Sequence, residues 1–430
     1  MLHKYIHFTS KEKATFRYHM IYSILEGIIF GILALNEFVF IKSLKGSNIQ
    51  LGILFQLTVV VFIFLIFFNV FIRRAENKQR LLQKTAIITR LPLFLIFFFP
   101  KDQMSYITNP YLHYFFLLLF LLFYFESPIT YPMANLLLKK NYQHDNFGTF
   151  YGFSTTINKL IALIVTFAYG VLLDFDNYAF TYILPMTAIL GVISIFILSK
   201  IEYSNKIKPA KNNSFLNSVG ESIQNMIHVI KNNSAFRHFE IGFMFYGFAY
   251  MITVAVITIF FQEVLSLNYT SVAFYKNTFN IIAIALIPFL GKIIGNIDPR
   301  KFAAFSFLSM ICAIFFIALT EYFPINFSFF QIKIYYILLI YVIFYGVFIG
   351  SMALVWRIGS AYFCKSDETD LYQSIHLSAT GIRGLIAPLL GIVIYEIIGF
   401  TYTFAIAILS LILAISILYW SLKNIPLNHK

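Results

Sequence analysis

Residues 372–396 read YQSIHLSATGIRGLIAPLLGIVIYE, a stretch apolar and long enough for a helix to cross a lipid bilayer. A hydrocarbon core of roughly 30 Å requires about 20 residues of α-helix. The whole chain of 430 residues is 59% hydrophobic and only 12% charged, more apolar than a soluble domain can bury. The sequence therefore predicts an all-α membrane protein. We expect about twelve spans, at 19–41, 51–72, 84–100, 110–138, 149–173, 178–199, 236–262, 271–294, 302–323, 334–356, 371–397 and 400–421.

The net charge of +13 comes mainly from basic residues between the predicted spans. Segments 73–84, 200–237 and 291–301 are basic, and all three fall on one side of the membrane when the spans are threaded in order. This bias follows the positive-inside rule and places both termini in the cytoplasm. It argues against a nucleic-acid partner. The first apolar run is expected to be a retained helix, and we expect a multi-pass protein of the bacterial inner (cytoplasmic) membrane.

The predicted spans fall into two groups of six. Residues 201–235 are polar, basic and rich in Asn and Ser, and this linker separates an N-terminal bundle, 1–200, from a C-terminal bundle, 236–430. Two short matches relate the halves. FRYH (16–19) resembles FRHF (236–239), and STTINKLIA (154–162) aligns with SATGIRGLI (378–386). These matches suggest an internal repeat of six helices.

This pattern resembles the major facilitator superfamily. The loop GKIIGNIDPRK (291–301) has the Gly, Arg and Lys of that family's loop motif, but Gly295 stands where the motif has Asp. The equivalent loop of the first half, NVFIRRAENKQR (69–80), departs further. The resemblance implies a secondary transporter in which two helical bundles alternate around a site near the bilayer midplane. It implies no cofactor.

Polar residues form a one-sided stripe on each of two matching spans. A charge at a helix centre costs roughly 2.5–3.5 kcal/mol, so it persists where it is paired or meets water. We therefore expect Arg383 to bind an anionic group of a small solute. The alternative is a structural ion pair of Arg383 with a glutamate. The expected solute-binding residues are Arg383, His376 and Thr380 on span 371–397, and Lys159, Thr155, Asn158 and Tyr151 on span 149–173.

Two acidic residues fall within predicted spans, and both are candidates for proton coupling. Glu26 lies in the first span, and Glu126 precedes Pro128 and Pro132, which are expected to kink the fourth span. A desolvated carboxylate can carry a proton near neutral pH. The alternative is a salt bridge of these glutamates with Lys159 or Arg383. Arg90 is expected near the end of the third span, with its side chain reaching to the interface.

Further residues are weaker cavity candidates: Lys276, Tyr22, Tyr246, Tyr250, Tyr341, Tyr345 and Trp356. The sequence contains no spacing typical of a metal centre, a phosphate loop or a hydrolytic triad. We therefore expect a transporter rather than an enzyme, acting as a monomer on a small molecule in the bilayer, with protons as the coupling ion. A flippase for lipid-linked intermediates, or a polytopic membrane enzyme, remains an alternative.

Overall fold

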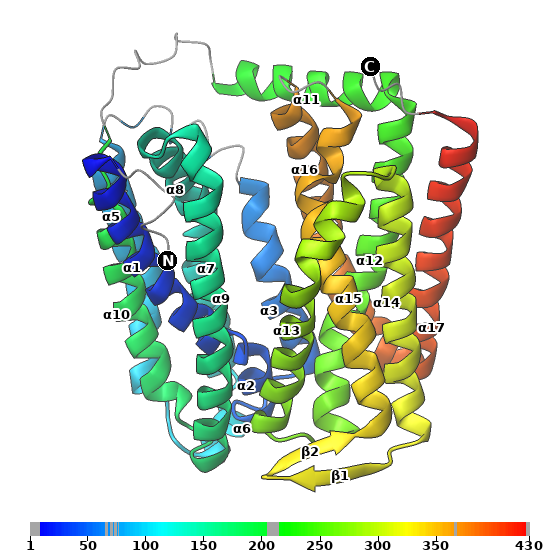
Figure 1. Ribbon diagram of the computed structural model, residues 1–430. Helices are drawn as coiled ribbons and strands as arrows, with labels where there is room; N and C mark the ends of the chain where they lie inside the picture. Colours follow the sequence, from blue (N-terminus) through cyan, green and yellow to red (C-terminus); the bar gives the residue numbers. More distant parts are fainter. Residues whose placement is uncertain are drawn as a thin grey trace. The chain divides into compact units, whose positions relative to one another are not determined.

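The computed structural model describes residues 9–64, 68, 72, 75, 77–203, 215–364 and 368–426. The chain divides into two compact units. The first comprises Met1–Gly46 and Val61–Asn213, and the second comprises Ser47–Val60 and Ser214–Lys430. Each unit is built from long helices, because a helix satisfies all of its backbone hydrogen bonds within itself in lipid (Figure 1).

In the described part of the first unit, five stretches are long and apolar enough to span a membrane. Its helices are α1 (Ser10–Leu33), α2 (Asn36–Lys42), η2 (Val61–Phe64), α5 (Lys78–Arg90), η3 (Leu91–Phe98), α6 (Gln103–Thr108), α7 (Tyr111–Tyr124), α8 (Ser127–Asn141), α9 (His144–Phe175) and α10 (Phe180–Leu198). α1 packs against α9 and α10. Gly27 permits the close approach to α9, since a Cβ there would lie 2.6 Å from the carbonyl oxygen of Asn158.

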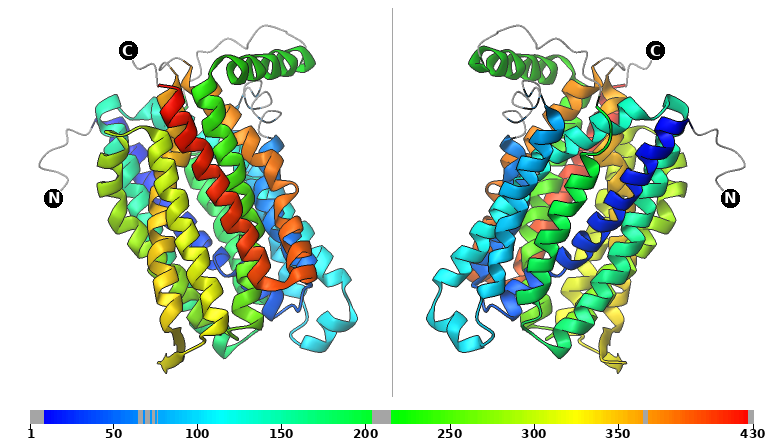
Figure 2. Two further views of the ribbon diagram at one scale, coloured as in Figure 1. Left: turned by 90° about the vertical axis from the view of Figure 1, so that its right-hand side faces the viewer. Right: turned by 90° about the vertical axis from the view of Figure 1, so that its left-hand side faces the viewer.

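The second unit contains the other five spanning stretches of the described residues. Its elements are α3 (Asn48–Val60), α11 (Phe215–Asn232), α12 (Ser234–Glu263), α13 (Tyr269–Ile294), α14 (Pro299–Tyr322), β1 (Asn326–Phe329), β2 (Ile332–Tyr335), α15 (Tyr336–Ile358), η4 (Gly359–Phe363), α16 (Thr369–Gly384) and α17 (Ala387–Asn424). Within this unit, α11 lies across one end of the upright helices and the β-hairpin lies at the other end (Figure 2).

The ten spanning stretches are consistent with the twelve predicted spans. The predicted spans 371–397 and 400–421 fall within one continuous stretch, Leu371–Asn424, whose helix bends at Gly399 with φ of 80°. The predicted span 51–72 includes most of α3 and all of η2, and most of its remaining residues lie outside the described part of the chain. The fold class is therefore confirmed, with a small antiparallel hairpin added at 326–335.

Two local features of the second unit were not expected from the sequence. Ser47–Val60 groups with the second unit, where Gly52 lies against Ile392 of α17. Arg300 of the basic 291–301 loop is 1% exposed and forms an ion pair with Asp298 at 2.7 Å. The same guanidinium donates to the carbonyl oxygen of Ser421, so it ties the start of α14 to the end of α17.

Candidate functional site

Three charged side chains meet inside the first unit. Glu26 is the seventeenth of 33 residues in the stretch Ser10–Lys42, and Arg90 is the thirteenth of 21 in Lys78–Phe98. Glu126 is the sixteenth of 31 in Tyr111–Asn141. Each side chain therefore lies near the middle of its span, and the exposed fractions are only 4%, 2% and 5%. We call Glu26, Arg90 and Glu126 the ion cluster.

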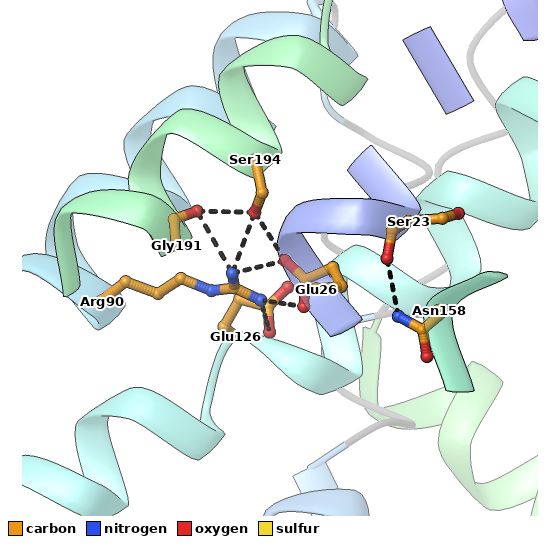
Figure 3. Close-up of polar contacts among 7 residues, drawn as sticks. All are labelled: Ser23, Glu26, Arg90, Glu126, Asn158, Gly191 and Ser194. Carbon is orange, nitrogen blue, oxygen red and sulfur yellow. Dashed lines mark hydrogen bonds and ion pairs between the residues drawn. The ribbon is translucent and has the colours of Figure 1, made fainter. Parts of the chain in front are cut away.

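The guanidinium of Arg90 is shared by the two carboxylates (Figure 3). Its Nη1 and Nη2 atoms lie 2.6 Å and 3.1 Å from the two carboxylate oxygens of Glu26. Nη2 also lies 3.0 Å from Oε2 of Glu126. Ser194 of α10 donates its hydroxyl to Oε1 of Glu26 at 2.5 Å. Arg90 therefore links four helical segments through charge-assisted hydrogen bonds, the stronger class of hydrogen bond.

Local sequence features place the three side chains at this depth. Glu126 lies at a break between α7 and α8, and Pro128 is the second residue of α8, as the expected kink requires. Arg90 ends α5 where Pro92 converts the helix to the tighter turn of η3. Gly191 allows the Arg90 side chain to lie on α10, since a Cβ there would be 2.6 Å from its Cδ.

The expectation that Arg90 reaches the membrane interface was wrong. The helix begins at Lys78, earlier than the predicted start at residue 84, because the amphipathic segment before the apolar run is also helical. Arg90 is therefore near mid-span and buried. Arg90 pairs with both Glu26 and Glu126, a partner that the sequence analysis did not propose for these glutamates. The side chain of Lys159 is exposed on α9.

The other candidates of the first unit lie around α1 and α9. The amide of Asn158 donates to the carbonyl oxygen of Ser23 at 2.9 Å, one turn before Glu26. The Tyr151 ring lies 6.0 Å from that of His19. Thr155 is half-buried on α9. Tyr22 interacts electrostatically with both carboxylates of the ion cluster. Asn158 and Tyr22 therefore lie close to the ion cluster, whereas Tyr151 packs toward His19.

In the second unit, Arg383 is buried beside the residues of its predicted stripe. It is 7% exposed, and its Nη1 donates to the carbonyl oxygen of Phe243 at 2.6 Å. Its Nη2 donates to Oγ1 of Thr380 at 3.0 Å. The guanidinium carbon lies 5.9 Å from the centre of the Tyr246 ring. The side chain lies on Gly247, where no Cβ would fit. Arg383 and Thr380 thus form one polar group on α16, where Arg383 packs against α12.

His376 has a partner that the sequence reading missed. Its Nδ1 lies 2.9 Å from Oε1 of Glu240 on α12, and both residues are buried. The ring of Trp356 lies 6.0 Å from the His376 ring. An acidic residue less than two turns inside the apolar run that begins at 236 was the available signal for Glu240.

The aromatic candidates of the second unit form a continuous group. Tyr246 and Tyr250 both contact Phe348, at ring-centre distances of 5.9 Å and 6.0 Å. Tyr345 contacts Phe348 at 5.5 Å and Tyr341 at 5.2 Å. Through Tyr246, this group reaches Arg383. Lys276 is half-buried on α13.

Ten spanning stretches among the described residues, with charges buried at mid-span, define a multi-pass membrane protein with a polar interior site. The family model of the Major Facilitator Superfamily matches residues 19–355, and the chain belongs to that family. The family and its structural neighbours are transporters rather than enzymes, as expected from the sequence.

Solved structures share this fold at low sequence identity. A mutant form of the nucleoside transporter NupG is 13% identical with a TM-score of 0.68, covering 96% of this chain and 100% of that one. A D-xylose–proton symporter is 10% identical with a TM-score of 0.67, covering 97% and 99%. A bacterial homologue of the human lysosomal transporter Spinster is 11% identical with a TM-score of 0.63, covering 97% and 98%. A search of curated proteins finds no match.

Proposed function

We propose that this chain is a proton-coupled secondary transporter for a small solute that carries an anionic group, working by alternating access of its two halves. The observation that carries the proposal is the ion cluster, in which two carboxylates share one guanidinium at mid-span. Neighbours in fold include a D-xylose–proton symporter and proton-dependent oligopeptide transporters, and proton coupling is compatible with this architecture.

The charge of the ion cluster favours a proton. With both glutamates ionised, the three side chains have a net charge of −1, and a buried uncompensated charge is costly. One proton on either carboxylate makes the cluster neutral. A structural ion pair would need only one carboxylate, so the second is available for a proton that enters and leaves during transport.

Glu126 is the better candidate for the proton carrier. Glu26 uses both oxygens on Arg90 and receives the Ser194 hydroxyl, so its ionised form is held by three short contacts. Glu126 meets the guanidinium through Oε2. Protonating Glu126 therefore sacrifices fewer charge-assisted hydrogen bonds, and Glu26 acts as the fixed partner of Arg90.

We further propose which residues bind the solute. Arg383 would bind the anionic group of the solute, supported by Thr380 and His376. The solute would also contact four residues of α9: Lys159, Thr155, Asn158 and Tyr151. The burial of a planar guanidinium beside a polar hydroxyl supports this role for Arg383. The basic segments support cytoplasmic termini, and we propose a monomer in the bacterial inner membrane.

Uptake into proteoliposomes tests this function. Solutes that raise the unfolding temperature of the purified chain are first selected from a panel of organic acids, amino acids, sugars, nucleosides and peptides. We expect a pH gradient, acid outside, to drive uptake of the selected solute. Glu126→Gln should abolish this gradient-driven uptake but retain exchange of labelled for unlabelled solute. Two results would contradict the coupling: solute uptake that does not depend on the pH gradient, or gradient-driven uptake that persists in Glu126→Gln.

A further inference from the structure

The second unit contains its own buried acid–base pair, Glu240 and His376. Nδ1 of His376 lies 2.9 Å and 3.2 Å from the two carboxylate oxygens of Glu240. His376 is 1% exposed and Glu240 is 7% exposed. Glu240 is the seventh residue of α12 and His376 is the eighth of α16, so the pair joins the two helices about two turns inside their ends.

One nitrogen of the His376 ring has no partner in the described part of the chain. Nε2 is buried and has no hydrogen-bond partner among the described residues. When Glu240 accepts the hydrogen on Nδ1, the neutral ring presents a lone pair at Nε2. A proton that adds there gives an imidazolium with an N–H on each ring nitrogen, and the adjacent carboxylate compensates its charge.

The charged groups near the pair set its electrostatics. Arg383, on the same helix as His376, interacts electrostatically with Glu240. Arg383, Glu240 and a neutral His376 therefore sum to zero charge, and one proton changes the sum to +1. Among the other titratable groups on the packed elements, Tyr246 contacts Arg383, Tyr372 accepts a hydrogen bond from Asn233, and Arg237 donates to the carbonyl oxygen of Ile230. The ring of His238 contacts that of Trp420. Glu368, Arg357, His228 and Lys231 are exposed.

The first unit offers a comparison at the corresponding pair of helices. There α1 and α9 also enclose a buried histidine, His19, whose Nδ1 lies 3.1 Å from the Tyr142 hydroxyl and 3.4 Å from the Ser154 hydroxyl. Hydroxyls are sufficient to satisfy a buried imidazole at such a junction. A carboxylate such as that of Glu240 is therefore not needed to satisfy a neutral imidazole between packed helices. It is needed to compensate the positive charge of an imidazolium.

We propose that Glu240 and His376 form a second proton-binding site, in which the proton adds to Nε2 of His376 and Glu240 stabilises the resulting imidazolium. Its part in transport rests on the proposed function. A proton on His376 leaves the group with one positive charge, which an anionic solute at Arg383 neutralises. Proton and anion thus favour each other's binding in the second unit, and this coupling is reciprocal.

Trp356 is a built-in reporter for this proton. Its ring lies 6.0 Å from that of His376, and an imidazolium quenches indole fluorescence more strongly than a neutral imidazole does. The chain has 2 Trp, and the other, Trp420, lies 5.2 Å from His238. A Trp420→Phe background therefore isolates the signal of Trp356.

The full-length Trp420→Phe protein in detergent is titrated between about pH 5 and pH 8, the range in which histidine changes its charge. We expect the Trp356 fluorescence to fall as the pH is lowered, and this fall to disappear in His376→Gln. Glu240→Gln should move the midpoint to lower pH by roughly one unit or more, because the compensating negative charge is lost. Glu263→Gln, the same change at the exposed far end of α12, should leave the midpoint unchanged.

Two results would overturn the proposal: fluorescence of the Trp420→Phe protein that does not change over this range, or a change that persists in His376→Gln. If His376→Gln does not elute as a folded protein, the midpoint of Glu240→Gln decides alone, and an unchanged midpoint rejects the site. The titration needs no solute. Its outcome is therefore independent of the uptake test on Glu126, and either proposal can fail without the other.

Discussion

Nη1 of Arg90 lies 2.6 Å from Oε1 of Glu26, although 64 residues separate the two in sequence. Both residues are buried near the middle of their spans, and Glu126 approaches the same guanidinium. Arg90 stabilises the ionised forms of the two glutamates, and the glutamates stabilise the charge of Arg90. If one partner is removed, water cannot replace it, because the site is buried. The consequences of removing one member are therefore large and have a predictable dependence on pH.

Arg90→Gln should strongly destabilise the protein. The substitution leaves two buried carboxylates without a compensating charge, and breaking a buried pair in this way costs about 3–5 kcal/mol. A proton can replace part of the lost compensation, so the loss of thermal stability should be larger near pH 8 than near pH 5. Unfolding followed by fluorescence at both pH values measures this. Arg357→Gln, at an exposed position, is the control. Equal stability of Arg90→Gln and the unmodified protein at the higher pH would refute the prediction.

Gly247→Ala should displace Arg383. A Cβ at residue 247 would overlap the guanidine group, which is held by the carbonyl oxygen of Phe243. Overpacking of this kind costs about 1–3 kcal/mol. Gly291→Ala is a matched control, because nothing lies within 4 Å of a Cβ there and alanine favours the helix. Gly247→Ala should therefore unfold at a lower temperature than Gly291→Ala. Similar unfolding temperatures would show that Arg383 adapts to the new side chain without a loss of stability.

Arg383→Lys should weaken solute binding even though the charge is kept. A lysine cannot reproduce the planar fork that reaches both Phe243 and Thr380, and it would present a point charge to the anionic group. Arg383→Gln should bind the solute still more weakly. Affinities of the solute selected by thermal shift, measured at matched folded yield, check this order. Unchanged affinity in Arg383→Gln would assign Arg383 to structure alone.

Cysteine accessibility should locate the two ends of the second unit. In a background with Cys312→Ser and Cys364→Ser, we expect Gln224→Cys on α11 to react with an impermeant maleimide only after cells are opened. Ser328→Cys in the hairpin at the opposite end should react in intact cells. Cysteines in 73–84, 200–235 and 357–370 should behave like Gln224→Cys. Labelling of α11 from outside would reverse the orientation.

The sequence by itself determined that the chain is built from membrane-spanning helices and roughly where they lie, because the length and apolar character of a segment decide whether it can cross lipid. It also identified Arg383, Glu26 and Glu126 as charges that need a partner, and it placed the kink beside Glu126, because Pro128 blocks helical hydrogen bonding. These properties are local, and each depends on residues that are close together in the chain.

The tertiary structure alone decided which charges pair. Arg90 meets Glu26 and Glu126, and His376 meets Glu240, because helices that are distant in sequence pack together and bring these side chains to the same depth. The depth of Arg90 depended on where its helix begins, which hydropathy defines poorly when an amphipathic segment precedes an apolar one. The electrostatic energy of an ion pair falls with distance. An error of two turns in the predicted position of one helix therefore places the two charges too far apart to be recognised as a pair.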